Sequence, residues 1–146
     1  GDYRIKITPA GQSQAVLTED VRVPANSAIT IAAADKVENL QLVTYKDDWN
    51  PVTGKAKVRF IHLSPDAPRV DIAVKGGDVL FSNVGFKQAT QYKSFSPGNV
   101  DLEVRPAGSN KVVLTIPNVM LEPNQVYNAV AVGLVEAQPS LEAMFI

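Results

Sequence analysis

Hydrophobic and polar residues alternate along several short stretches of the chain, notably residues 3–7, 70–75 and 100–105. A period of two places one set of side chains on a core and the other set in water, which is typical of β-strands. Residues 29–34 and 126–132 are apolar almost throughout and are interpreted as central strands. Glycine and proline interrupt the pattern every eight to twelve residues. This spacing predicts an all-β, antiparallel, immunoglobulin-like β-sandwich.

The chain also contains an internal repeat. GDYRIKITPAGQSQAVLT, from Gly1, and GNVDLEVRPAGSNKVVLT, from Gly98, share seven identities over eighteen positions. The similarity continues, after a shift of one residue, between residues 21–34 and 119–132. The offset of 97 to 98 residues is close to the ~100 residues of an immunoglobulin-like sandwich. The N-terminal segment is therefore predicted to form a second, partial sandwich.

The repeat divides the chain into three predicted parts. Residues 1–46 form the back half of a first repeat, residues 47–56 form a linker, and residues 57–146 form a complete sandwich of seven or eight strands. The predicted core of the complete repeat comprises Val58, Phe60, Val70, Ile72, Val74, Leu102, Val104, Val130 and Val132.

Residues 1–45 match a back half without a matching front half, and a few strands without a partner sheet are unstable in water. We expect this segment to complete its sandwich by strand addition, with a second copy of the protein or with a cleaved upstream fragment. The alternative is that it folds back onto residues 57–146. Because the chain begins with Gly1 and not with Met, a mature or trimmed product is expected.

Composition excludes several classes of function. The 146 residues are 45% hydrophobic and 20% charged, and the net charge of −1 offers no basic surplus to bind nucleic acid. No apolar run approaches the ~18 residues of a transmembrane segment. The absence of cysteine excludes disulfides, thiolate nucleophiles and cysteine-ligated zinc. No Gly-x-Ser-x-Gly, phosphate-loop or His-Glu-x-x-His motif occurs. We therefore predict no enzyme, no cofactor, and no catalytic, cofactor-binding or metal-binding residue.

The stretch FIHLSPDAPRVDI, residues 60–72, holds the only histidine of the chain and is interpreted as a structural corner between two strands. Strand alternation places the histidine on the core face, where its imidazole should bond a backbone group of the following turn. The two prolines fix the backbone, and serine and aspartate bond nearby N–H groups. The corner residues are His62, Ser64, Pro65, Asp66 and Pro68.

Three functional readings compete with this corner. His62 with Asp66 or Asp71 could ligate a metal, but one histidine without cysteine makes a poor zinc site. Calcium takes six to eight oxygen ligands, and the sequence has no Asp-x-Asp-x-Asp cluster. A serine hydrolase would need His62 as its base, on a strand that is predicted to be internal. The structural reading is favoured over all three.

Five stretches resemble one bacterial family, the domain of unknown function 4397. They are VRFIHLSPDAPRVDIAV, FSNVGF, the SPG before a strand, LEVRPAG and VYNAVAVG. The resemblance covers residues 57 to about 146, and residues 1–45 as the tail of a preceding tandem copy; Leu63 replaces the small residue that usually follows the histidine. It implies a β-sandwich fold, tandem domains and export, often with surface or lipid anchoring. It implies no activity.

These observations favour a non-enzymatic extracellular or cell-surface module with a structural or adhesive role. Its partners would be other β-sandwich domains or copies of itself, and its location would be secreted, periplasmic or on the bacterial surface. The alternative is a carbohydrate- or peptide-binding module that uses end loops and exposed aromatic residues. Trp49, in the linker, fits either reading, as a docking anchor between units or as a ring that stacks on a sugar. An enzyme is the third hypothesis.

Overall fold

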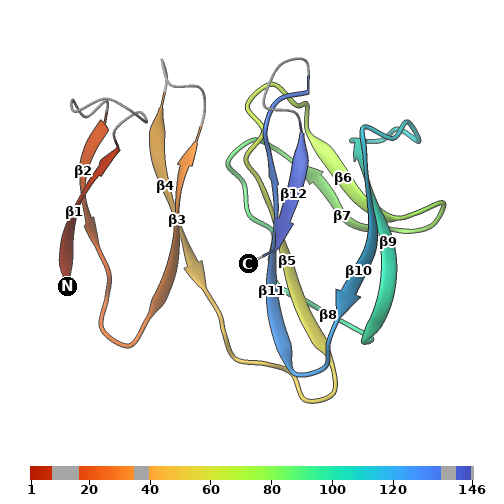
Figure 1. The fold of residues 1–146 in the computed structure, drawn as a ribbon, viewed down its shortest axis with the longest axis horizontal. Coiled ribbons are helices and arrows are strands. Elements are labelled where there is room, and N and C mark those ends of the chain that lie inside the picture. The colour runs from red at the N-terminus through yellow and green to blue at the C-terminus, as the bar shows by residue number, and fades with distance from the viewer. Residues whose placement is uncertain (8–16, 35–39, 136–140, 146) are drawn as a thin grey trace. The chain divides into compact units, whose positions relative to one another are not determined.

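A computed structural model describes residues 1–7, 17–34, 40–135 and 141–145. All twelve elements in these residues are β-strands (Figure 1). The chain divides into two compact units, Gly1–Trp49 and Asn50–Ile146. The division falls inside the predicted linker. Each unit is described by itself below.

The first unit contains two antiparallel pairs of strands, each a separate two-stranded sheet in the described residues. Alternating apolar residues at Tyr3, Ile5 and Ile7 give the first strand its single apolar face. The strands are β1 (Asp2–Ile7) with β2 (Leu17–Arg22), and β3 (Ala28–Ala34) with β4 (Gln41–Asp47).

The second unit is a β-sandwich of eight strands in two four-stranded sheets. One sheet has the order β10-β9-β6-β7 and the other has the order β12-β11-β5-β8 (Figure 1). The strands are β5 (Ala56–His62), β6 (Val70–Val74), β7 (Val79–Val84), β8 (Lys93–Phe95), β9 (Gly98–Pro106), β10 (Leu114–Leu121), β11 (Gln125–Val132) and β12 (Glu142–Phe145).

The core lies between the two sheets and follows the period of two along most strands. It includes the predicted residues Val58, Phe60, Val70, Ile72, Leu102 and Val104. On β11 the prediction holds in part. Val130 is buried as predicted, at 3% exposed, although the core cluster includes its neighbours Ala129 and Ala131 instead, and Val132 is only partly buried. Val74 is also only partly buried, at the end of β6.

One strand pair departs from the antiparallel arrangement. β5 and β11 run parallel, with Phe60 beside Ala129 and Val58 beside Tyr127. β5, the first strand of the unit, therefore lies between the short strand β8 and the C-terminal pair β11–β12. This pairing makes the second sheet mixed rather than purely antiparallel.

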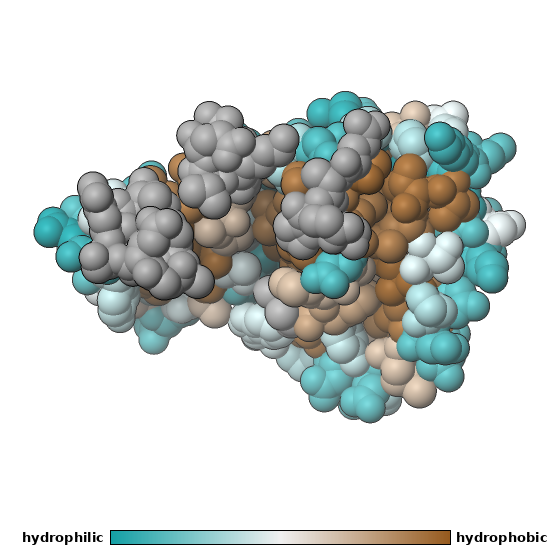
Figure 2. Space-filling model, turned by 45° about the horizontal axis from the view of Figure 1, so that its top comes forward, coloured by the Kyte–Doolittle hydropathy of each residue, from teal (hydrophilic) through white to brown (hydrophobic). Residues whose placement is uncertain are grey.

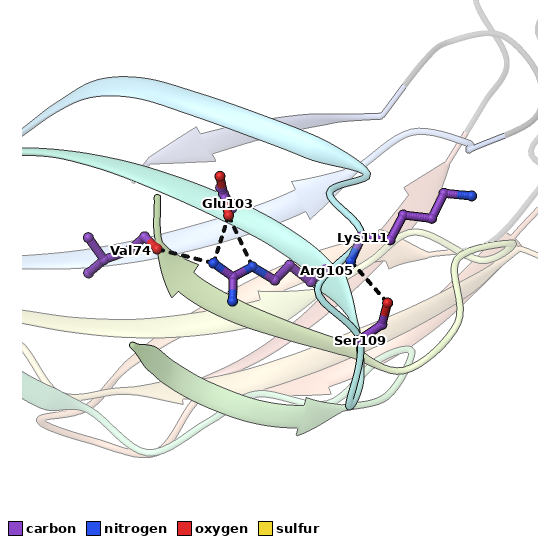
Figure 3. Close-up of polar contacts among 5 residues, drawn as sticks. All are labelled: Val74, Glu103, Arg105, Ser109 and Lys111. Atoms are coloured by element: carbon purple, nitrogen blue, oxygen red, sulfur yellow. Dashed lines mark hydrogen bonds and ion pairs between the residues drawn. The ribbon is translucent and has the colours of Figure 1, made fainter. Parts of the chain in front are cut away.

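Three polar residues of the β10-β9-β6-β7 sheet are buried, although the alternation of residues predicted that their side chains would lie in water. Asp71, Glu103 and Arg105 are each 7% exposed. Arg105 donates from Nε (3.0 Å) and Nη2 (2.8 Å) to Oε2 of Glu103, and from Nη2 to the carbonyl oxygen of Val74 at 3.3 Å (Figure 3). Residues two apart on one strand share a face, so the charges of Glu103 and Arg105 offset each other where water is excluded.

Candidate functional site

The corner after β5 is organised around the imidazole of His62, which is 1% exposed. Its Nε2 lies 3.0 Å from the carbonyl oxygen of Pro68, and its Nδ1 accepts the backbone N–H of Ser64 at 3.2 Å. These partners require a neutral ring with the proton on Nε2, because Nδ1 must keep a lone pair. Burial lowers the pKa of His62, and the nearby positive charge of Arg69 lowers it further, against the opposing bond to Pro68. Both ring nitrogens are thus used by the backbone of the corner.

The remaining corner residues connect two segments of the sandwich. Ser64 is fully buried, and its carbonyl oxygen accepts the N–H of Ala67 at 3.3 Å, which closes the turn over Pro65. The exposed carboxylate of Asp66 accepts the N–H of Val135 at 2.7 Å and lies 3.4 Å from Oγ of Ser64. Asp66 therefore joins the corner to the segment that follows β11.

Asp71 uses both carboxylate oxygens for backbone groups. Its Oδ1 accepts the N–H of Asn83 at 2.8 Å, and its Oδ2 accepts the N–H of Gly108 at 3.0 Å. Asn83 has a φ of 55°, where β7 departs from regular pairing with β6. In this arrangement Asp71 holds two neighbouring segments onto β6.

An aspartate on β9, the strand that pairs with β6, accepts a backbone N–H in a similar way. Oδ1 of Asp101 accepts the N–H of Asn118 at 2.8 Å, and Asn118 also has a φ of 55° at the irregularity of β10. Asparagine tolerates this left-handed region better than most residues. Among the described residues, no group of three or more histidine, cysteine, aspartate or glutamate side chains could hold a metal ion.

A second polar cluster, which the sequence did not indicate, lies on the second sheet. Nε of Arg59 and the hydroxyl of Tyr92 each donate to Oδ1 of Asn128, both at 2.8 Å. The guanidinium of Arg59 lies 4.8 Å from the centre of the Tyr92 ring. Asn128 is fully buried and Arg59 is 5% exposed. The cluster joins β5, β11 and the segment before β8, and only the final fold brings its members together.

A cavity of about 190 Å³ lies between the two sheets. Ser96 is the only polar residue of its lining, which otherwise consists of Val58, Phe60, Ile72, Val74, Leu80, Phe81, Phe95, Val100, Leu102, Leu121, Ala129 and Phe145. Figure 2 shows hydrophobic surface on the second unit between hydrophilic margins. Apart from Ser96, this lining offers no polar side chain that could position a substrate.

Trp49 ends the first unit and is 46% exposed. Its ring is therefore neither fully packed nor fully in water. Among the described residues, no helix has the length and apolar character needed to cross a membrane.

The all-β fold, with a β-sandwich in its second unit, defines this chain as a β-rich module. It belongs to the domain of unknown function 4397 family, whose model matches residues 1–73 and 69–146. The two matched segments are consistent with tandem copies of the domain.

Seven chains of solved structures match this protein. One is described as the C-terminal domain of AlgF from P. aeruginosa; it is 21% identical, with a TM-score of 0.49, and the alignment covers 64% of this chain and 98% of that chain. No curated protein matches.

Proposed function

We propose that this protein is a non-enzymatic structural or adhesive module of the bacterial exterior that assembles through strand addition. The observation that carries the proposal is the pair of two-stranded sheets in the first unit. Isolated two-stranded sheets are marginally stable in water, so this unit gains stability from a further set of strands. A module that is completed by a neighbour suits a tandem array, in which the work is mechanical or adhesive.

The polar residues of the second unit support a structural role. His62, Asp66 and Asp71 direct their side-chain atoms to backbone groups of the corner, of the segment after β11 and of β7. Side chains engaged in this way stabilise the sandwich and are poorly placed to transfer protons to a substrate. The family carries no assigned activity, so this part of the proposal stands on the geometry alone.

The extracellular part of the proposal can be tested on intact cells. An antibody raised against residues 50–146 should label unlysed cells of the producing bacterium, or should detect the protein in its culture medium. Treatment of intact cells with protease should abolish the cell-surface signal, while a cytoplasmic control protein stays intact. Detection only after complete lysis would overturn an exterior location.

A second candidate function is the binding of carbohydrate or peptide, and the half-exposed ring of Trp49 favours it. An exposed indole can stack on a sugar ring, and this chain has one tryptophan, so its fluorescence reports on one site. Titration with oligosaccharides or extended peptides should then shift the emission and saturate, and Trp49→Phe should weaken binding measured by calorimetry. No heat and no shift with any of them would exclude this candidate.

A further inference from the structure

The first pair of strands in the chain repeats part of a pair in the complete sandwich. Ile7 pairs with Leu17 in β1–β2, and Val104 pairs with Leu114 in β9–β10. The two pairs are related by the 97-residue offset of the sequence repeat. The registers agree up to the irregularity of β10, so β1–β2 is the counterpart of β9–β10.

The second pair of strands also has a counterpart, although its register differs. Ile31 pairs with Thr44 in β3–β4, and Ala129 pairs with Phe145 in β11–β12. The offset of 98 residues places Ile31 at the position of Ala129 and Thr44 at the position of Glu142, so the two pairings differ by three residues. The first unit therefore carries counterparts of both strand pairs of a sandwich back half, and only β1–β2 keeps the register of its counterpart.

In the second unit, the other edges of these strands are occupied by front-half strands. β9 pairs with β6, with Val104 opposite Ile72 and Leu102 opposite Val74. β11 pairs in parallel with β5, with Ala129 beside Phe60. In the first unit, the described residues give β1 only β2 as a partner and give β3 only β4.

The residues that would face a sandwich core are more exposed in the first unit than their counterparts. Tyr3 is 58% exposed and Ile31 is 38% exposed, whereas Ala129, the counterpart of Ile31, is 8% exposed. Ile5 and Ile7 are partly buried, and their counterparts Leu102 and Val104 are buried. This apolar face matches one that is covered by β5–β8 elsewhere in the same chain.

We propose that β1 and β3 accept the front half of a further repeat of this family, a four-stranded segment with the pattern of β5–β8. Its β6-like strand runs antiparallel to β1, with the counterparts of Ile72 and Val74 opposite Ile7 and Ile5. Its β5-like strand runs parallel to β3, with the counterpart of Phe60 beside Ile31. This inference rests on the strand addition proposed above, and it names the partner, the two acceptor edges and the polarity of each pair.

The numbers of front halves and back halves in the chain exclude another copy's β5–β8 as the source of this segment. The described part of the chain contains two back halves, β1–β4 and β9–β12, and one front half, β5–β8. β5–β8 is already paired with β9–β12. If a second copy donated β5–β8 to β1–β4, its own β9–β12 would lose that partner. After such an exchange, one back half would still lack a front half. The partner must therefore bring an additional front half.

The test supplies that front half in cis. A second copy of residues 50–97 is joined directly to Gly1, which reproduces the natural junction of Pro97 with Gly98. In the extended protein, amide hydrogen exchange of Ile5, Ile7 and Ile31 should slow by about 100-fold or more relative to the original chain. The matched control carries the same extension with Phe60→Asp and Ile72→Asp in the added copy only, and it should leave exchange at these positions unchanged.

Sedimentation and exchange of the original chain complete the test. A monomer with fast exchange at Ile5 and Ile31, together with slow exchange in the extended protein, supports the inference. Three results would overturn it: unchanged exchange in the extended protein, a dimer of the original chain that protects β1 and β3, or a monomer already protected by folding back. These results do not depend on labelling of the cell surface, so failure here and failure of the exterior location are distinguishable.

Discussion

The carboxylate of Asp71 is expected to be one of the most sensitive polar groups of the second unit. It is 7% exposed and accepts two backbone N–H groups, from Asn83 on β7 and from Gly108 after β9. Asp71→Asn keeps one acceptor oxygen and places an NH₂ group against the other N–H. A hydrogen bond to a charged group contributes about 1.5–3 kcal/mol, and a buried donor left unpaired adds to the loss. We expect Asp71→Asn to lower the free energy of unfolding by about 2–3 kcal/mol.

Asp101→Asn is the matched control, because Asp101 accepts a single N–H, from Asn118, in a more exposed place. Its expected cost is about 1 kcal/mol. Urea unfolding followed by far-ultraviolet circular dichroism measures both variants, and equal slopes against denaturant are required for the comparison. For a unit of this size, the loss in Asp71→Asn corresponds to a fall in Tm of roughly 10–20 °C.

Two results would refute this reasoning. Asp71→Asn could cost no more than Asp101→Asn, which would mean that the second hydrogen bond contributes nothing. Alternatively, calcium could stabilise the wild type but not Asp71→Asn, which would make the carboxylate a metal ligand rather than a backbone acceptor.

Three further predictions concern the core, the corner and metal binding. Ile72→Ala, at a site 3% exposed, should cost about 2–4 kcal/mol in urea unfolding, whereas Val79→Ala, at a site 46% exposed, should cost less than about 0.5 kcal/mol. Because burial lowers the pKa of His62, the unfolded chain binds a proton more readily than the folded one, and stability should fall as pH drops below about 6.5. His62→Gln should flatten that part of the pH profile, and an unchanged slope would contradict the assignment. Calcium or zinc at sub-millimolar concentration should leave the Tm unchanged; a rise of several degrees would show that the native state binds metal.

The strands and the sandwich could be predicted because their signals are local. Alternation in residues 70–74 and 100–105, with glycine and proline between the strands, indicates strands without reference to any partner. The phase of β11 could not be fixed in this way, because Ala129, Val130, Ala131 and Val132 are all apolar. Which of them faces the core depends on the strand beside β11, and that strand is 69 residues earlier in the chain.

The polar clusters could not be predicted from the sequence for a related reason. Asp71 and Glu103 look like solvent-facing residues, because their strands alternate. The N–H groups that pair with Asp71 come from 12 and 37 residues further along the chain, whereas Glu103 pairs with Arg105 on its own strand. The bonds from Arg59 and Tyr92 to Asn128 link positions 69 and 36 residues apart. The corner was more accessible, since Ser64, Pro65 and Pro68 are turn residues and His62 bonds a carbonyl only six residues ahead.

The parallel pairing of β5 with β11 also governs how the second unit can fold. β5 is the first strand of the second unit to leave the ribosome, yet its parallel pairing with β11 must wait until residues 125–132 have been synthesised. Closing a loop of this length is slow, and unpaired strand edges are prone to capture by other strands in the interval. During that delay the nascent front half and the earlier strands β1–β4 are both present in one chain. If the array proposed above is made as one chain, we expect pairing with the preceding repeat to compete with waiting for the following one.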